Sequence, residues 1–462
     1  MTVASEVSFL VAFALTLAGI FYLALGGSSR AATGTDYSLS GRDASTLNVF
    51  GAITGTLVGG SSTIGTAQLA FLYGVSAWWF TLGAGLACLF LGLFIAVPLR
   101  HSQAQTIPEF IALYHGRQVR IVASLFTAVG MFIQIVAQLL ACGAILAVLF
   151  DLSLVASAAI STVLVLGFTL GGGMKSAGLT GMVKMVLIYL TMVIAGFLAF
   201  RQSGGWQGLR ATFDAWPWFS LFGYGVSEGV SDLVSMLVGV VSTQTYLQAI
   251  FSARDATRAR RGALLSAALI PPLGLFGILV GLTMRQTMPE LQSALALPTF
   301  ILAGFPPWLA GIAFATLLIA AIGTASGLAL GVATTLKSDV FQRWLQGAVE
   351  LKAFRLMTVA VVGGAFVLLL SNLGSAIMEW SFLSMGLRGA TLCFPLLFAV
   401  FFARRSLRHA GLVAVTVAPL AVIVSGFFPR LGVSPLFIGL GLSLLILTAG
   451  LWMTAQQQRG GG

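Results

Sequence analysis

Long apolar runs follow one another along almost the whole chain, and this pattern restricts the fold more than any other feature of the sequence. Of the 462 residues, 58% are hydrophobic and only 8% are charged. Soluble domains carry about 25% charged residues, and a membrane-spanning helix needs about 20 mostly apolar residues. We therefore expect an all-α integral membrane protein, surrounded by the lipid bilayer, that forms a single transmembrane domain over residues 1–462.

Charges, prolines and glycine clusters divide the apolar sequence into about thirteen predicted transmembrane helices. The divisions between the second and third helices and between the fourth and fifth are the least clearly marked. The predicted spans are residues 7–26, 47–72, 75–98, 119–149, 153–171, 177–200, 225–250, 261–284, 308–333, 354–371, 376–402, 408–427 and 433–453.

The uneven distribution of Lys and Arg over the predicted loops indicates the orientation. Of the 24 Lys and Arg residues, 18 lie in loops on one side, four lie in loops on the other side, and two lie inside spans. Cytoplasmic loops carry such an excess, so we expect the N-terminus outside and the C-terminus in the cytoplasm of a cytoplasmic (inner) membrane. The net charge of +11 then needs no nucleic acid partner. The four outer residues are Arg201, Arg210, Arg285 and Arg430.

Several functional classes are disfavoured by what the chain contains. The stretch from Gly171 to Ser176 resembles a phosphate loop only superficially, since Met174 interrupts it, and no nucleotide domain is recognisable. The three histidines fall in predicted loops, and no pair of Asp residues shares a mid-membrane position, so an intramembrane enzyme is not expected. We also predict no organic cofactor. The cysteines, which lie in apolar runs and are interpreted as buried thiols, are Cys88, Cys142 and Cys393.

Two spans carry a polar interruption at mid-membrane depth. Residues 54–65 of the second helix combine the adjacent glycines Gly59 and Gly60 with several hydroxyl residues. Residues 239–246 of the seventh helix are a second polar stretch, five helices later. Unwound backbone persists in a bilayer only where it lines a cavity, and paired interruptions of this kind indicate a transporter built from inverted repeats.

Short motifs elsewhere in the chain have the order and spacing of a known family. They are residues 36–42, Thr106 to Phe110, Gly171 to Ser176, Ser242 to Asp255, and Ala320 to Ser326 followed by Ser338-Asp339. On these residues the chain resembles the solute:sodium symporter family, with a fold of the leucine-transporter type. The resemblance covers nearly the whole sequence.

The resemblance implies an architecture and an activity. The architecture is a five-plus-five inverted repeat of helices 2–6 and 7–11, in which helices 2 and 7 are discontinuous. Residues 47–200 would form the first repeat and residues 225–402 the second, with an extra helix at 7–26 and two further helices at 408–453. The implied activity is cation-coupled symport of a small organic solute by alternating access, with Na⁺ as the coupling ion.

In that family a sodium ion lies between the break of helix 2 and the middle of helix 9. The resemblance places its carbonyl ligands at Gly55, Val58 and Ala320 and a hydroxyl ligand at Thr324. Oxygen ligands suit such a hard cation. A second hydroxyl position holds Gly323 in this chain, so one side-chain ligand is missing. Ser326 or a water molecule can replace it if the helix is slightly rotated.

Helix 6 departs from the family pattern, because the usual aspartate is absent and Lys184 is present. If Lys184 faces the contact between helices 2 and 9, its ammonium can take the place of sodium, as a lysine does in some proton-coupled relatives of this architecture. Burial disfavours the charged form of an amine, so such a lysine can couple transport to protons. The alternatives are that Lys184 extends to the cytoplasmic surface or pairs with a carboxylate.

The resemblance also places the solute beside the break, between helices 2, 4, 7 and 11. Arg388 is the one cation there that can clamp a carboxylate, which favours an organic acid or an amino acid as the small-molecule substrate. A structural pairing of Arg388 with Asp232 is the alternative. A sensor that binds a solute without transporting it is the competing class of function. The candidate substrate residues are Ser61, Ser62, Thr63, Gln134, Gln138, Thr243, Gln244 and Arg388.

Overall fold

The computed structural model describes residues 3–26, 42–171, 177–341, 349–371, 375–402, 407–426 and 433–460. Within these ranges the regular structure is helical, apart from one isolated parallel bridge between Ala44 and Ala253. Most of the motif at residues 36–42, and the part of the glycine motif at residues 172–176, lie outside the described residues.

Every predicted span falls on one or more of the observed helices. The helices of the first half are α1 (Val3–Gly26), α3 (Thr46–Leu57), α4 (Thr66–Tyr73), α5 (Trp79–Phe90), α6 (Ala96–His101), α7 (Ile107–His115), α8 (Arg117–Phe150), α9 (Leu154–Gly171), α10 (Ala177–Gln202) and α11 (Gly205–Thr212). Those of the second half are α12 (Val226–Val241), α13 (Gln244–Ser252), α14 (Ala256–Thr287), α15 (Ala296–Gly304), α16 (Pro307–Thr335), α17 (Val349–Leu370), α18 (Ile377–Phe401), α19 (Arg408–Gly426) and α20 (Pro435–Gly460). Short 3₁₀ and π segments connect or extend them: η3 (Ser61–Gly65), η4 (Gly74–Trp78), η5 (Leu91–Ile95), η7 (Ser293–Leu295) and η8 (Leu336–Val340).

The helices are apolar enough to belong in a bilayer. Among the described residues, eight helical stretches have the length and hydropathy to cross a membrane. A ninth results when α12 and α13, which meet at an angle of 41°, are taken as one broken span. The chain is therefore an all-helical, multi-pass membrane protein.

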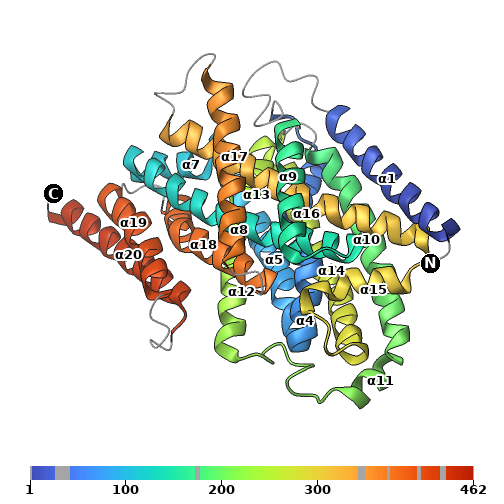
Figure 1. The fold of residues 1–462 in the computed structure, drawn as a ribbon. Helices are drawn as coiled ribbons and strands as arrows, with labels where there is room; N and C mark the ends of the chain where they lie inside the picture. Colours follow the sequence, from blue (N-terminus) through green and yellow to red (C-terminus); the bar gives the residue numbers. More distant parts are fainter. Residues whose placement is uncertain are drawn as a thin grey trace.

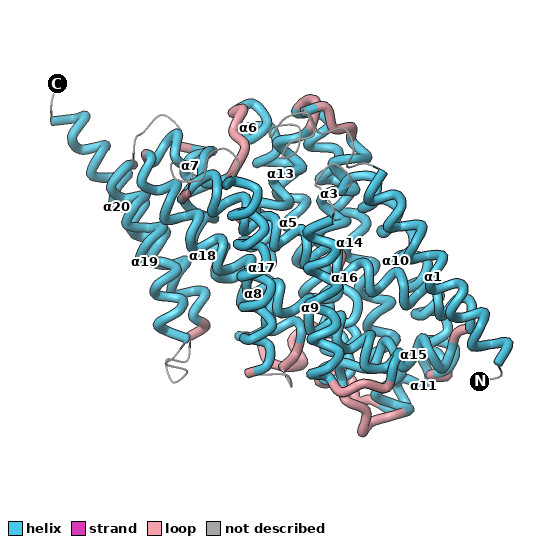
Figure 2. The backbone as a smooth tube through the Cα atoms, turned by 45° about the horizontal axis from the view of Figure 1, so that its top comes forward, coloured by secondary structure: helices cyan, strands magenta, loops and turns pink. Residues whose placement is uncertain are grey.

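The helices pack into a single bundle whose centre holds α8, α16 and α18 (Figure 1). Helix α1 lies along α16 on one side, whereas α19 and α20 pack together against α18 on the other. Figure 2 shows α7 and α13 at one end of the bundle and α11 and α15 at the opposite end. These are called the α7 end and the α15 end below.

Local sequence explains where several helices begin. Thr106 caps α7 by accepting a hydrogen bond from the backbone N–H of Glu109, and a proline follows in the first turn. Asp255 caps α14 in the same way through the N–H of Arg258. Its cap starts α14 at Ala256, five residues before the predicted span at residue 261.

Helices α3 and α10 approach so closely that glycine is required on both. A Cβ atom on Gly181 would lie 2.3 Å from the carbonyl oxygen of Gly51, and one on Gly55 would lie 2.6 Å from the Cα of Gly181. Glycines of this kind let membrane helices pack backbone against backbone. Lys184 lies one turn beyond Gly181, so this contact determines where the lysine side chain reaches.

Gly181→Ala should therefore separate α3 from α10. The colliding atoms belong to the backbone and cannot rotate away, so we expect a loss of stability of about 1–3 kcal/mol, as for other overpacked sites. The measurement is thermal unfolding of the purified protein in detergent. Gly327→Ala on α16 is the matched control, because its new methyl group would meet nothing within 4 Å. Equal melting temperatures for the two variants would contradict the close-contact interpretation.

Candidate cation and solute site

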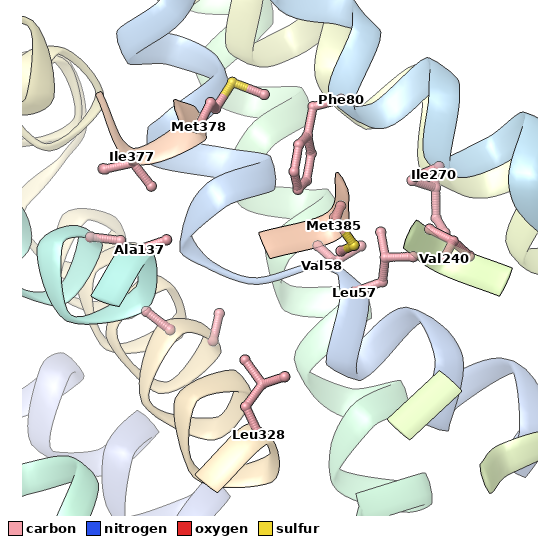
Figure 3. Close-up of a cluster of buried hydrophobic side chains, with 14 of the residues drawn as sticks. Leu57, Val58, Phe80, Ala137, Val240, Ile270, Leu328, Ile377, Met378 and Met385 are labelled. Atoms are coloured by element: carbon pink, nitrogen blue, oxygen red, sulfur yellow. The ribbon is translucent and has the colours of Figure 1, made fainter. Parts of the chain in front are cut away.

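The predicted interruption of the second span is confirmed. Helix α3 ends at Leu57, and Val58 leaves the helical conformation with φ −86° and ψ 90°. The chain becomes helical again in the π-helix η3 at Ser61. Figure 3 shows this irregular stretch at Val58, surrounded by apolar side chains such as Phe80, Val240 and Met385. Polar backbone groups are thus released inside an apolar environment, where they need partners.

Lys184 supplies such a partner. Its side chain is buried, with an exposed fraction of 4%. The Nζ atom donates hydrogen bonds to the carbonyl oxygen of Gly55, to the carbonyl oxygen of Ala320 at 3.3 Å and to Oγ1 of Thr324 at 3.4 Å. These are three of the four residues predicted to hold sodium; the fourth, Val58, is the residue at which α3 ends. The alternatives in which Lys184 reaches the cytoplasmic surface or pairs with a carboxylate do not fit these contacts.

The residues around this ammonium come together because the break brings α3 against α16. A Cβ atom on Gly59 would lie only 2.7 Å from Oγ1 of Thr324. Gly323, in contrast, has open space where a side chain would be. Ser326 does not substitute for the missing ligand, since its hydroxyl faces α9, where it accepts a hydrogen bond from Thr169 at 2.9 Å.

A second group of polar residues lies immediately beyond the break. Ser61 Oγ receives hydrogen bonds from the amide groups of Gln138 at 2.9 Å and Gln134 at 3.3 Å, and it lies 2.7 Å from Oγ of Ser381. Gln138 also accepts a hydrogen bond from the N–H of Gly60 at 2.9 Å. We call Ser61, Gln134, Gln138 and Ser381 the central polar cluster.

The central polar cluster carries no formal charge and has one open hydrogen-bonding position. Gln134 Nε2 donates to Ser381 at 3.0 Å, but Gln134 Oε1 is buried and has no hydrogen-bond partner among the described residues. The hydroxyls of Ser62 and Thr63 turn instead to the carbonyl of Gly59, at 3.1 and 3.0 Å. Sequence reasoning selected Ser61 and both glutamines correctly as neighbours of the break but missed Ser381. Ser381 lies two helical turns before Arg388 on the same helix, and this spacing was the sequence feature that could have identified it.

Arg388 lies further along α18 and is completely buried. It donates to Thr243 Oγ1 at 2.8 Å and to Ser384 Oγ at 2.8 Å. The predicted alternative pairing with Asp232 is wrong, because the carboxylate of Asp232 accepts its hydrogen bond from the Tyr224 hydroxyl.

Gln244, which was predicted to lie beside the solute, is not a member of the central polar cluster. Its Oε1 accepts a hydrogen bond from the N–H of Ile107 at 2.9 Å, and its Nε2 donates to the carbonyl of Gln105 at 3.1 Å. Gln244 therefore ties the second half of a broken helix to the start of α7. Its side chain turns toward α7 because the backbone N–H of Ile107, in the first turn of that helix, has no partner within the helix and needs an acceptor.

Gln68, which sequence reasoning missed, makes an equivalent tie at the α15 end. Its Oε1 accepts from the N–H of Ile377 at the start of α18, at 2.9 Å, and its Nε2 lies 3.5 Å from Oγ of Ser293 in η7. A small cavity of about 30 Å³ adjoins these residues. Gln68 and Gln244 thus make similar contacts, each joining the second half of a broken helix to a helix start.

A broken helix with freed oxygens around a cationic group, inside an apolar helical bundle, is the arrangement of membrane transporters. The sequence model of the sodium:solute symporter family matches residues 37–412. The chain therefore belongs to the sodium:solute symporter family, and it is a transporter rather than an enzyme.

Individual relatives are distant. The chain is 23% identical over 419 residues to the high affinity choline transporter 1 of Homo sapiens, covering 86% of this chain and 72% of that protein. It is 24% identical over 337 residues to the uncharacterized symporter YwcA of Bacillus subtilis strain 168, covering 67% of this chain and 64% of that protein. The chain thus spans about two thirds of the length of these relatives.

Solved structures show the same fold at low sequence identity. A Na⁺-coupled sialic acid symporter in a substrate-bound outward-open state superimposes with a TM-score of 0.76 at 16% identity, covering 97% of each chain. Mhp1, a nucleobase-cation-symport-1 family transporter, matches with a TM-score of 0.63 at 14% identity, covering 91% of this chain and 95% of that one. The leucine-transporter type of fold expected from the sequence is therefore present.

The hydrogen bonds of the central polar cluster give a direct test of its packing. Gln138→Met keeps the length of the side chain but leaves the N–H of Gly60 without its acceptor. An unsatisfied buried donor costs about 1–3 kcal/mol, so we expect a lower melting temperature in detergent. Gln202→Met, at an exposed position at the end of α10, is the control. Unchanged stability of Gln138→Met would show that the cluster does not depend on this bond.

Proposed function

We propose that the protein is a secondary active transporter that moves a small organic solute across the cytoplasmic membrane by alternating access. In this proposal the chain crosses the membrane about thirteen times, with the N-terminus outside and the C-terminus in the cytoplasm. Residues 47–200 and 225–402 form the two inverted repeats, residues 7–26 an additional helix and residues 408–453 the last two. Family membership supports cation-coupled symport as the general activity.

We propose further that the ammonium of Lys184 acts as the cation at the family's sodium position. One observation carries this assignment: Lys184 Nζ donates to Gly55 and Ala320 carbonyls and to the Thr324 hydroxyl. A protonated amine presents a positive charge and three donors to these oxygens. The neutral amine loses the charge that the oxygens stabilise and can withdraw, which loosens the contact between α3 and α16. Binding and release of one proton at Nζ then accompany each transport cycle.

Sodium coupling is the second candidate. The backbone and hydroxyl oxygens around the ammonium are of the kind that bind Na⁺. When the amine of Lys184 is neutral and withdrawn, oxygens of Gly55, Val58, Ala320 and Thr324 are available to Na⁺. The solute in either case lies at the central polar cluster, close to Thr243 and Arg388. A sensor function is distinguished by reconstitution, since a sensor binds its solute but does not accumulate it in proteoliposomes.

The two cation assignments differ in their response to sodium. We expect the thermal stability of the wild-type protein in detergent to be the same in NaCl and in KCl at neutral pH, because the ammonium fills the site. Lys184→Ala combined with Gly323→Ser removes the ammonium and supplies the missing hydroxyl, for which the structure has space. This double variant should be stabilised by Na⁺, by about 2–3 kcal/mol when Na⁺ is about 100-fold above its dissociation constant.

Gly327→Ser with Lys184→Ala is the matched control, because Gly327 also has open space. Sodium stabilisation of the wild-type protein would favour the sodium-coupled alternative. In proteoliposomes, uptake by the wild-type protein should follow an imposed pH gradient, and Lys184→Gln should lose that dependence. A pH response retained in Lys184→Gln would contradict proton coupling through this residue.

Alternating access requires one end of the pathway to open while the other stays closed. We propose that Gln68 closes the outer (α15) end and Gln244 the cytoplasmic (α7) end, through the hydrogen bonds described above. Both side chains are buried, so each lost bond leaves a backbone N–H without a partner and favours opening of that end. The Gln68 bonds thus favour the inward-open state and the Gln244 bonds the outward-open state in one conformational equilibrium.

Gln68→Ala should therefore favour the outward-open state and Gln244→Ala the inward-open state. The measurement is labelling of a cysteine introduced at Leu154, which lines the cavity beside Gln68, with a membrane-impermeant maleimide. Cys88, Cys142 and Cys393 are buried, and the Leu154→Cys protein without other changes gives the background. We expect faster labelling with Gln68→Ala and slower labelling with Gln244→Ala. A change in the same direction for both variants would refute opposite gates.

A further inference from the structure

Arg388 holds a positive charge in the interior and has no negative partner among the residues that the structure describes. Its side chain has an exposed fraction of 0%. The ion pairs within the described part of the chain join Arg120 to Asp339, Arg254 to Asp43 and Arg258 to Asp255, and none of them includes Arg388. Buried charges are normally paired, because an isolated ion loses its hydration without compensation.

The groups that surround the guanidinium are neutral, and one of them is a poor acceptor. Nε donates to the carbonyl of Ser384 at 3.1 Å, Nη1 donates to Thr243 Oγ1 at 2.8 Å, and Nη2 donates to Ser384 Oγ at 2.8 Å. The remaining contact of Nη2 is Sδ of Met385 at 3.2 Å. A thioether accepts hydrogen bonds only weakly, and its flexible side chain moves aside easily. An anion at this position would therefore gain two strong donors.

The guanidinium lies next to the central polar cluster. Ser381, Ser384 and Arg388 follow one another on the same face of α18, at helical spacing. The side chain of Arg388 also crosses Gly130 on α8, since a Cβ atom there would lie 2.4 Å from its Cγ. Gln134, whose Oε1 has no partner, is four residues further along α8, about 6 Å at a rise of 1.5 Å per residue. An unpaired cation and an unused acceptor thus lie about one helical turn apart.

Two positive charges lie close to the central polar cluster. Lys184 is held at Gly55 and Thr324, next to Gly59 and Gln138. Arg388 binds the hydroxyl of Ser384, which is one helical turn beyond Ser381 of the cluster. Among the described residues no carboxylate forms an ion pair with either cation: Asp339 pairs with Arg120, and Asp232 accepts its hydrogen bond from Tyr224. The surroundings of the cluster therefore attract an anion and repel a quaternary ammonium.

From this arrangement we propose that the transported solute is a small organic acid with a hydroxyl or amino group about one helical turn from its carboxylate. The carboxylate displaces Met385 and accepts hydrogen bonds from Nη1 and Nη2 of Arg388, the bidentate geometry that guanidinium favours. The hydroxyl or amino group donates to Oε1 of Gln134. This inference rests on the proposed transport function and specifies its substrate class. It separates this chain from the choline named for its human relative.

The experiment uses the purified full-length protein in detergent and measures its thermal stability with defined probes. The probes are the potassium salts of 4-hydroxybutyrate, butyrate and chloride, together with choline chloride at the same concentration. We expect 4-hydroxybutyrate to stabilise most, butyrate less, and choline chloride no more than potassium chloride. Stabilisation by chloride equal to that by the carboxylates would assign an inorganic anion site and overturn the proposal, as would the absence of stabilisation by any carboxylate.

Variants locate the probe. Arg388→Gln should raise the dissociation constant of 4-hydroxybutyrate about tenfold or more, and Arg388→Lys, which keeps the charge but not the paired donors, should retain part of the affinity. Gln134→Leu should remove the advantage of 4-hydroxybutyrate over butyrate. If Arg388→Gln does not fold, Thr243→Val tests the same position, since it loosens the guanidinium without removing it. Unchanged probe affinity in Thr243→Val and Arg388→Lys would show that Arg388 has only a packing role.

Proteoliposomes separate this inference from the function on which it rests. Binding of 4-hydroxybutyrate through Arg388 without accumulation would leave the anion site intact and refute transport. Accumulation of choline without binding of any carboxylate would leave transport intact and refute the anion site.

Discussion

The backbone oxygens released where α3 ends must find partners inside an apolar bundle, and the rest of the site depends on how this need is met. The hydrocarbon core of a bilayer supplies no water to exposed backbone groups, so each freed carbonyl needs a cation or a donor from within the protein. Here the ammonium of Lys184 joins Gly55 to Ala320 and Thr324, and the amide of Gln138 accepts from Gly60. The break is thus stabilised from α8, α10 and α16 at once. Loss of one of these hydrogen bonds would therefore weaken the contacts of the break with several helices and favour a change of conformation.

The same physical constraint explains the packing around the break. Gly55 and Gly181 bring two backbones together, and Gly59 lets Thr324 approach. Without these small residues the lysine would not reach its acceptors. In the proposed assignment, a sodium ion and the lysine are alternative solutions to one problem, which is the neutralisation of several carbonyl dipoles by one positive charge. A tethered cation differs from a free one because its charge depends on pH and its position depends on one side chain.

The break and the shared face of Gln134 and Gln138 could be predicted, because each rests on local pattern. The grouping of Gly55, Ala320 and Thr324 around one positive charge was expected only from the family resemblance. Paired glycines and hydroxyls in an apolar helix have few other uses, and an i, i+4 spacing fixes a shared face. The partners of Arg388, Gln244 and Gln68 could not be predicted, because they depend on which helices meet in three dimensions. The bond of Gln244 could not be predicted, since the sequence does not reveal that the start of α7 lies within its reach. Ser381 was overlooked because a lone serine in an apolar helix usually bonds its own helix.

The central claim is that Lys184 takes the place of a sodium ion, and direct binding of radioactive sodium to the purified protein tests it most simply. At neutral pH the account predicts no saturable sodium binding by the wild-type protein. It predicts clear saturable binding once Lys184→Ala has emptied the position and Gly323→Ser has supplied the missing hydroxyl. Saturable binding by the wild-type protein, with an affinity equal to that of the variant, would contradict it.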